Sequence, residues 1–200
     1  MTAVVGALVL AAGYSRRFKG QKLTATINKK NPITVYEETI NQLTNAYPEI
    51  SHIIAIIQKG APSKLPLTKA TTIEYPSDQI GIGESIAFGS QYISSWEGCL
   101  ICLADMPFIR TETYKAIASR VTATNIVIPK FNGIAGNPIA FGKDHFHVLN
   151  KLKGDEGARK VLKNHQNLTL EVETNDPGVL HDIDTPNDLL NAERRFVGRE

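Results

Sequence analysis

The strongest constraint on the fold lies in residues 4–23, where an apolar run passes into a loop of small residues and then into a group of cations. The run at residues 4–10 is short, apolar and followed by turn residues, which predicts a buried strand near the N-terminus. In the loop after it, Gly13 tolerates backbone angles that other residues resist. The cations that follow are Arg16, Arg17, Lys19 and Lys22.

A loop of this composition is suited to bind an anion. Successive backbone N–H groups in a turn form an anion-binding concavity, and arginine and lysine supply the countercharge for phosphate. The segment is therefore predicted to bind the phosphates of a nucleoside triphosphate. An ordinary strand-to-loop connection with solvated charges has the same pattern and stays open as the alternative.

Length and charge exclude several classes of protein. The 200 residues suit one domain, residues 1–200, and 42% of them are hydrophobic, which is ordinary for a globular chain. No apolar run reaches transmembrane length, and no basic region precedes the first apolar stretch, so we expect a cytoplasmic protein that does not bind membranes. A net charge of only +2 argues against nucleic acid as the main partner.

The chain contains one C-x-x-C pair, Cys99 and Cys102. It lies inside an apolar run that is typical of a strand, whereas a redox pair normally opens a helix. Residues three apart on a strand point to opposite faces, so the two sulfurs should not meet. Both cysteines are predicted to be buried and inert.

The remaining pattern predicts an α/β fold. We expect strands at residues 4–10, 52–58, 71–75, 99–104 and 125–129. We expect helices at residues 33–46, 85–93 and 112–121, the first of them capped by Asn31 with Pro32 at its first position. This alternation predicts a mostly parallel central sheet with helices on both faces. Ligands bind such sheets at the carboxyl ends of the strands, so the loops that start at Ala11 and Asp105 are predicted to share one rim.

Acidic residues are the second chemical feature. Asp105 follows an apolar strand and can offer a hard oxygen to Mg²⁺, although a turn or cap residue would occupy the same place. Asp182 and Asp184 alternate around Ile183 on what resembles a strand end, which places both carboxylates on one face. After them, Thr185-Pro-Asn-Asp188 has the composition of a helix start.

Leu10-Ala-Ala-Gly-Tyr-Ser-Arg-Arg-Phe-Lys-Gly-Gln-Lys22 resembles the signature L-A-A-G-x-S-x-R-[MF]-G-x-x-K of MobA-like nucleotidyltransferases, especially their molybdenum cofactor cytidylyltransferase branch. Further segments resemble that family's motifs in order. They are Gly81-Ile-Gly-Glu-Ser-Ile-Ala-Phe-Gly89, Ala104-Asp-Met-Pro107, Gly136-Asn-Pro138, Gly154-Asp-Glu-Gly-Ala-Arg159 and Asp182-Ile-Asp-Thr-Pro-Asn-Asp-Leu189.

The resemblance implies a single-domain Rossmann-like fold, similar to nucleotide-diphospho-sugar transferases, and roles for individual residues. Nucleotide binding is implied for Ala11, Ala12, Gly13, Ser15, Arg17, Lys22, Gly81 and Ser85. Catalysis is implied for Arg17, Lys22 and Asp105, with Asp105 and Asp184 as ligands of Mg²⁺. The acceptor is implied to contact Asn137, Arg159 and Asp182.

The implied reaction moves a nucleoside monophosphate from a nucleoside triphosphate to a phosphorylated acceptor and releases pyrophosphate. CTP is favoured over GTP because Ala12 stands where guanylyltransferase relatives usually have a second glycine. Molybdopterin is the expected acceptor, and a molybdenum hydroxylase apoenzyme is a further expected partner.

Two alternatives stay open. One is an NAD(P)H-dependent oxidoreductase of the same family, for which Gly81-x-Gly83-x-x-Ile86 is an incomplete G-x-G-x-x-G. The other is a non-catalytic carrier or maturation factor for the molybdenum cofactor.

Overall fold

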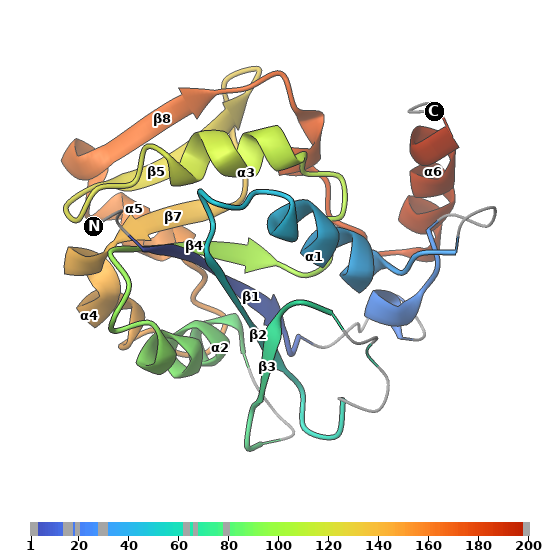
Figure 1. Cartoon of the computed structure of the whole chain (residues 1–200), viewed down its shortest axis with the longest axis horizontal. Coiled ribbons are helices and arrows are strands. Elements are labelled where there is room, and N and C mark those ends of the chain that lie inside the picture. Colours follow the sequence, from blue (N-terminus) through green and yellow to red (C-terminus); the bar gives the residue numbers. More distant parts are fainter. Residues whose placement is uncertain are drawn as a thin grey trace.

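The computed structural model describes residues 4–13, 18, 21–27, 32–61, 65, 68–77 and 81–197, with the backbone alone from residue 192. Its described part is built around one eight-stranded sheet, shown in Figure 1. The strands are β1 (Val5–Ala11), β2 (His52–Ile57), β3 (Thr71–Glu74), β4 (Gly98–Leu103), β5 (Ile126–Phe131), β6 (Ile134–Ala135), β7 (Ile139–Gly142) and β8 (Thr169–Glu173). The strand order is β3-β2-β1-β4-β7-β5-β6, and β8 pairs with β5.

The N-terminal strand lies in the middle of the parallel half of the sheet. β1 is buried along its whole length and pairs in parallel with β2 on one side and β4 on the other, so that Leu8 lies opposite Ile54 and Ile101. β3 continues the parallel set beyond β2. The strand predicted from the apolar run is therefore confirmed, and the carboxyl ends of β1 and β4 lie side by side.

The other half of the sheet departs from a purely parallel arrangement. β7 lies between β4 and β5 and runs antiparallel to both, while β8 is parallel to β5. β5 turns into β6 through Asn132 and Gly133, whose φ angles are +50° and +76°. An Asn-Gly pair with two left-handed residues is the favoured two-residue hairpin turn, which explains the reversal of direction at this point.

Helices cover both faces of the sheet, as the alternation predicted. They are α1 (Val35–Thr44), α2 (Ile82–Gly89), α3 (Thr111–Ala118), α4 (Phe146–Leu149), α5 (Arg159–Lys163) and α6 (Pro186–Val197). The 3₁₀ helices are η1 (Lys22–Thr24), η2 (Ser90–Tyr92), η3 (Lys143–His145), η4 (Gln166–Leu168) and η5 (Pro177–Leu180). Every helix in the described ranges is too short or too polar to span a bilayer.

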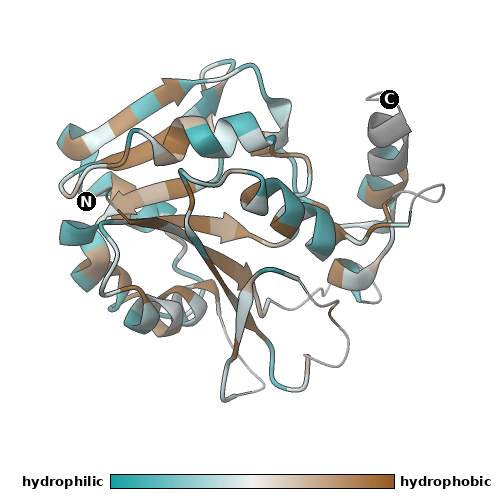
Figure 2. Ribbon diagram, viewed as in Figure 1, coloured by the Kyte–Doolittle hydropathy of each residue, from teal (hydrophilic) through white to brown (hydrophobic). Residues whose placement is uncertain are grey.

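The two faces of β1 belong to two separate cores. Val9 packs in a cluster with Tyr36 of α1 and Tyr114 of α3, whereas Leu8 packs in a second cluster with Ile86 of α2 and Phe146 of α4. Figure 2 shows hydrophobic residues concentrated in the strands, while the helices carry hydrophobic and hydrophilic residues together. Successive side chains of β1 point to opposite faces of the sheet, and a core covers each face. A nearly continuous apolar strand is therefore required at the centre of the fold.

The cysteines behave as the strand pattern predicted. Cys99 belongs to the core beneath α2 and α4, and Cys102 belongs to the core beneath α1 and α3. Burial raises the pKa of both thiols well above the ordinary range, which disfavours the reactive thiolate. The pair therefore contributes packing to the sheet.

The predicted start of α1 was wrong. Asn31 lies outside the described residues, and the helix begins at Val35 with Thr34 as its N-cap, so Pro32 precedes it. The Thr34 hydroxyl accepts a hydrogen bond from Glu37 N at 3.2 Å, and the Glu37 carboxylate accepts one from Thr34 N at 2.9 Å. This reciprocal capping box satisfies two backbone donors, which the Asn-Pro start would not have done.

Candidate active site

Three aspartates meet at the carboxyl end of the parallel strands. Asp105 follows β4, and Asp182 and Asp184 lie between η5 and α6; one carboxylate oxygen of each lies within 4.8 Å of the other two. The turn after β4 is held against the end of β1, because Ala104 N donates to Leu10 O at 3.2 Å. Two acidic segments far apart in the sequence thus meet on one rim, as expected.

Ile183 explains why both neighbouring aspartates face Asp105. Its backbone N–H donates to Asp105 O at 2.9 Å, and its side chain is completely buried in a small cluster that includes Val35 and Phe108. Residues 181–184 lie outside the strands of the sheet, so the expected strand end was wrong. The alternation nevertheless holds, because one hydrogen bond and one buried side chain anchor the segment.

The start of α6 matches the predicted composition and also supports the site. The Asp188 carboxylate accepts hydrogen bonds from Thr185 N at 2.7 Å, from the Thr185 hydroxyl at 2.8 Å and from Asp184 N at 3.1 Å. Asp188 N in turn donates to the Thr185 hydroxyl at 3.2 Å. The capping network therefore restrains the backbone that carries Asp184, a role the sequence did not indicate.

Lys22 joins the two acidic segments. This residue begins η1, and its Nζ lies 2.5 Å from Asp105 Oδ2 and 3.0 Å from Asp184 Oδ1, with 11% of the side chain exposed. Burial by itself lowers the pKa of the Lys22 ammonium, but Asp105 and Asp184 outweigh it and raise that pKa above its ordinary value. Among the described residues one ammonium faces three carboxylates, so this part of the site carries an excess of negative charge.

The acidic cluster fits a divalent metal ion. Asp105 Oδ1 is buried and has no hydrogen-bond partner among the described residues, although a buried polar atom ordinarily has one. The pKa of Asp182 lies above its ordinary value because surrounding protein limits its hydration and because the carboxylates of Asp184 and Asp105 lie close. Carboxylate oxygens are the ligands that Mg²⁺, Ca²⁺ and Mn²⁺ prefer, so this group can hold such an ion.

The residues expected to contact the nucleotide lie in different surroundings. Ala11 and Ala12 are buried, whereas Gly13 is exposed. A Cβ on Gly13 would meet no atom of the described residues within 4 Å, and the φ angle of Gly13 lies outside the left-handed region. Within the described part of the chain, the space beside Gly13 agrees with a ligand there. Ser15 and Arg17 lie outside the described residues.

Gly81 and Gly83 are explained by packing between two loops. A Cβ on Gly81 would lie 2.2 Å from Gly154 O, and one on Gly83 would lie 2.7 Å from Lys153 O. Gly83 N donates to Gly154 O at 2.8 Å, and Ser85 is 3% exposed. These contacts account for the glycine pattern on which the oxidoreductase alternative rested.

The three residues expected to bind the acceptor line one cavity. Asn137, Arg159 and Asp182 border a space of about 330 Å³. Arg159 Nη2 donates to Ala135 O at 2.9 Å, and Asn137 N donates to Val179 O at 2.9 Å. The sequence did not indicate the apolar walls, which come from Leu103, Met106, Ile134, Ala135, Val179 and Leu180.

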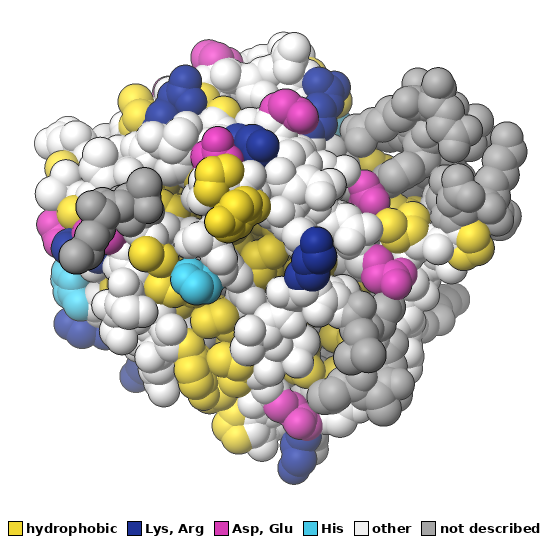
Figure 3. Space-filling view, viewed as in Figure 1, with side chains coloured by type: hydrophobic (Ala, Val, Ile, Leu, Met, Phe, Trp, Pro, Cys, Tyr) yellow, Lys and Arg dark blue, Asp and Glu magenta, His cyan; other side chains and the backbone are white. Residues whose placement is uncertain are grey.

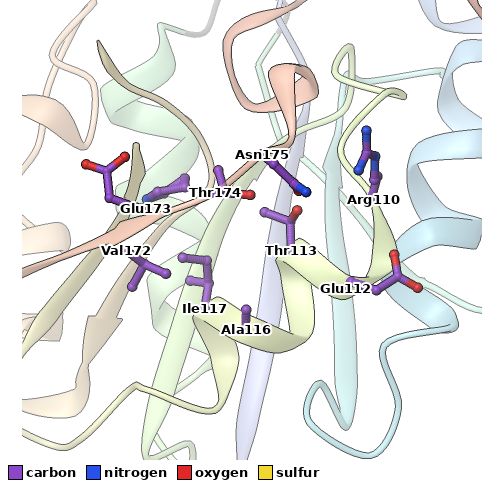
Figure 4. Close-up of a pocket in the computed structure, with 10 residues that line it drawn as sticks. Arg110, Glu112, Thr113, Ala116, Ile117, Val172, Glu173, Thr174 and Asn175 are labelled. Carbon is purple, nitrogen blue, oxygen red and sulfur yellow. The ribbon is translucent and has the colours of Figure 1, made fainter. Parts of the chain in front are cut away.

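A second space, of about 590 Å³, lies between α3 and β8. Figure 4 shows Thr113 and Ile117 of α3 on one side, and Val172 and Thr174 on the other. It shares no lining residue with the cavity beside Asp182 and includes none of the three aspartates. Among the described residues on the face drawn in Figure 3, Lys and Arg side chains are interspersed with Asp and Glu.

Comparison with known proteins shows which family the chain belongs to. A model of the MobA-like NTP transferase domain matches residues 7–168, which is most of the chain. The chain belongs to the MobA-like NTP transferase family. The match begins within β1 and includes Lys22 and Asp105, but it ends before Asp182 and Asp184. The family resemblance carried by residues 10–22 is thus confirmed.

Two curated proteins illustrate how broad the relationship is. This MobA-like transferase is 29% identical to purine catabolism protein PucB of Bacillus subtilis over 198 residues, 92% of this chain and 94% of PucB. It is 27% identical to molybdenum cofactor cytidylyltransferase of Escherichia coli over 101 residues, 50% of this chain and 51% of that enzyme. These two relatives have different names, so the similarity supports the family of this chain and does not identify its substrates.

Solved structures show the same fold. A nucleotidyl transferase from Methanothermobacter thermautotroptrophicus, Mth528, superposes with a TM-score of 0.81 at 19% identity, covering 98% of this chain and 99% of that one. The manganese complex of Rv0371C from Mycobacterium tuberculosis gives 0.78 at 22% identity, covering 96% and 98%. This MobA-like transferase therefore has the nucleotide-diphospho-sugar transferase-like architecture predicted for it.

Proposed function

We propose that this MobA-like transferase moves a nucleoside monophosphate, with CTP as the favoured donor, to a phosphorylated acceptor, with molybdopterin as the first choice. The observation that carries the proposal is the convergence of Lys22, Asp105 and Asp184 on the rim of β1 and β4. The similarity to a cytidylyltransferase over half the chain supports CTP, as does Ala12 in place of a second glycine.

The chain's own groups would act by positioning and by neutralising charge. The backbone at Ala11, Ala12, Gly13 and Ser15, together with Arg17 and Lys22, would bind the triphosphate. An oxygen of the acceptor phosphate would form a bond to the α-phosphorus while the bond to the β-phosphate oxygen breaks, and pyrophosphate would leave. No protein nucleophile is required for this transfer.

Asp105 and Asp184 would hold Mg²⁺, with Asp182 in support. Asp105 Oδ1 is buried without a hydrogen-bond partner in the described ranges, and this and the cluster of oxygens within 4.8 Å support the assignment, as does a structural neighbour solved with manganese. When bound, the ion supplies positive charge beside the phosphate oxygens of the substrate. Lys22 Nζ contacts one oxygen of Asp105 and one of Asp184, so these two carboxylates lie close enough to share a cation.

The cavity beside Asp182 would receive the acceptor. A volume of about 330 Å³ lies at the small end of the roughly 300–1,000 Å³ range of ligand pockets. Its apolar walls suit a ring system, the Asn137 amide can hydrogen-bond to ring heteroatoms, and the Arg159 guanidinium can pair with the acceptor phosphate. Asp182 lines this cavity and is also a member of the acidic cluster, so the acceptor would lie next to the reacting phosphate.

Pyrophosphate release is the direct test. Each of the four nucleoside triphosphates is incubated with the protein and Mg²⁺, with and without molybdopterin. We expect release that requires molybdopterin and is fastest with CTP. Release with a different nucleotide would correct the donor, and no release in any combination would overturn the transferase proposal.

Molybdopterin binding and a separate incubation with NAD(P)H distinguish the alternatives. A carrier would bind molybdopterin without releasing pyrophosphate, and an oxidoreductase would consume NAD(P)H with saturable loss of absorbance. A molybdenum hydroxylase apoenzyme as partner is tested separately by co-purification with the protein after the transfer reaction.

A further inference from the structure

The ammonium of Lys22 contacts two of the three carboxylates that are proposed to hold the metal. Nζ lies 2.5 Å from Asp105 Oδ2 and 3.0 Å from Asp184 Oδ1, and the Lys22 side chain is only 11% exposed. These are close, charge-assisted contacts in a partly buried place, where water screens charge less than at the surface. Lys22 therefore already supplies Asp105 and Asp184 with a cation.

A divalent ion and this ammonium compete for the same place. An ion held by Asp105 and Asp184 would lie within a few ångströms of Nζ, because both positive centres need the same pair of carboxylates. Two cations at that separation repel each other, and the repulsion is strong where protein replaces water. The net attraction of the acidic cluster for a metal ion is thus reduced for as long as Lys22 remains between Asp105 and Asp184.

The Lys22 side chain can leave this position while the backbone stays in place. Lysine carries its charge on a flexible four-carbon chain with three donors and no fixed fork, so Nζ can move several ångströms without a change in the backbone. It belongs to a 3₁₀ helix of only three residues, beside the exposed Gln21. A phosphate group is negatively charged, as the carboxylates are, and offers the ammonium an alternative partner.

We propose that Lys22 gates the metal site: its ammonium holds Asp105 and Asp184 until a phosphate-bearing ligand draws it away, and the two carboxylates then bind a divalent ion tightly. The inference rests on the metal site of the proposed function and adds an order of events to it. Metal and nucleotide binding are coupled through Lys22, so each strengthens the other by the same factor.

A lysine that gates the site and a lysine that only organises the carboxylates predict opposite changes in metal affinity when the Lys22 charge is removed. Removing the charge while keeping the chain length, as in Lys22→Met, should increase the affinity for Mn²⁺ in the absence of any nucleotide. We expect an increase of about tenfold or more over the wild-type protein. If Lys22 only organised the carboxylates, the same variant would bind Mn²⁺ more weakly.

The measurement is Mn²⁺ binding followed by electron paramagnetic resonance, with no nucleotide present. Lys22→Arg keeps the charge and should bind as weakly as the wild type. Lys143→Gln removes one positive charge at an exposed pair with Glu97 and should leave Mn²⁺ affinity unchanged. Adding Asp105→Asn to Lys22→Met should abolish the gain, which places the ion at the acidic cluster.

The outcomes separate the gate from the metal site itself. Binding that Asp105→Asn removes, but that Lys22→Met does not tighten, overturns the gate and leaves the proposed metal site intact. Binding that Asp105→Asn leaves unchanged in every background overturns the metal site, and the gate with it.

A measurement on the wild-type protein covers the case in which Lys22→Met does not fold. The ¹⁵N signal of the Lys22 ammonium is assigned by its loss in Lys22→Arg and followed during titration with Mg²⁺. We expect the signal to shift as Mg²⁺ binds, because Nζ leaves its two carboxylate partners. A signal that stays constant while the ion binds would contradict the gate.

Discussion

The backbone N–H of Ile183 donates a hydrogen bond of 2.9 Å to the carbonyl oxygen of Asp105, and this bond joins the two segments that carry the acidic cluster. The Ile183 side chain is completely buried on the other side of its segment. The placement of Asp182 and Asp184 therefore depends on apolar packing as much as on charge, because the carboxylates by themselves repel one another.

Ile183→Ala should destabilise the protein by about 2–4 kcal/mol, since it leaves a cavity where a fully buried side chain was. The free energy of unfolding in urea measures this. Ile134→Ala is the matched control, because Ile134 is 59% exposed and its loss should change stability by less than about 0.5 kcal/mol. Equal effects of the two changes would show that Ile183 does not anchor the segment.

Asp105→Asn should lower the rate of pyrophosphate release by about 100-fold or more while the protein stays folded. The amide keeps the shape of the side chain but gives up the negative charge that faces Lys22 and the proposed ion. Circular dichroism checks the fold, and Asp144→Asn, away from the cluster in η3, should retain the wild-type rate. Wild-type turnover in Asp105→Asn would exclude this carboxylate from the reaction.

Asp188→Ala should cost about 1 kcal/mol of stability, because three hydrogen-bond donors at the start of α6 lose their acceptor. It should also raise the Mg²⁺ concentration that half-saturates the reaction, since one of those donors is the backbone of Asp184. Asp188→Glu restores the usual capping-box residue and should recover both properties. Loss of stability without a change in the Mg²⁺ requirement would limit Asp188 to capping the helix.

Gly13→Ala should lower nucleotide affinity, whereas Gly81→Ala should lower stability. A Cβ on Gly13 meets no atom of the described residues, so stability should change by less than about 0.5 kcal/mol while nucleotide affinity falls. A Cβ on Gly81 meets Gly154 O at 2.2 Å, so that variant should lose about 1–3 kcal/mol of stability. Thermal unfolding and nucleotide titration of both proteins measure the contrast. Unchanged nucleotide affinity in Gly13→Ala would remove Gly13 from the proposed binding loop.

Much of this arrangement could be predicted from local patterns. The apolar run that became β1, the burial of Cys99 and Cys102 on opposite faces, and the helix start at Thr185 all follow from side-chain spacing within a few residues. The shared rim followed from a general property of parallel sheets. The cap of α1 was missed although Thr34-x-x-Glu37 was readable, because Asn-Pro offered a second acceptable start.

The sequence by itself determined which residues form the central strand, which carboxylates follow strands and which family the chain resembles, because those properties reside in short segments. Only the tertiary structure decided that Lys22 lies between Asp105 and Asp184, that Gly81 packs on Gly154, that β7 runs antiparallel beside β4, and that Met106 and Val179 wall the cavity beside Asp182. Each of these is a contact between residues far apart in the chain, and the sequence pattern can predict that two segments share a rim of the sheet but not which of their atoms meet there.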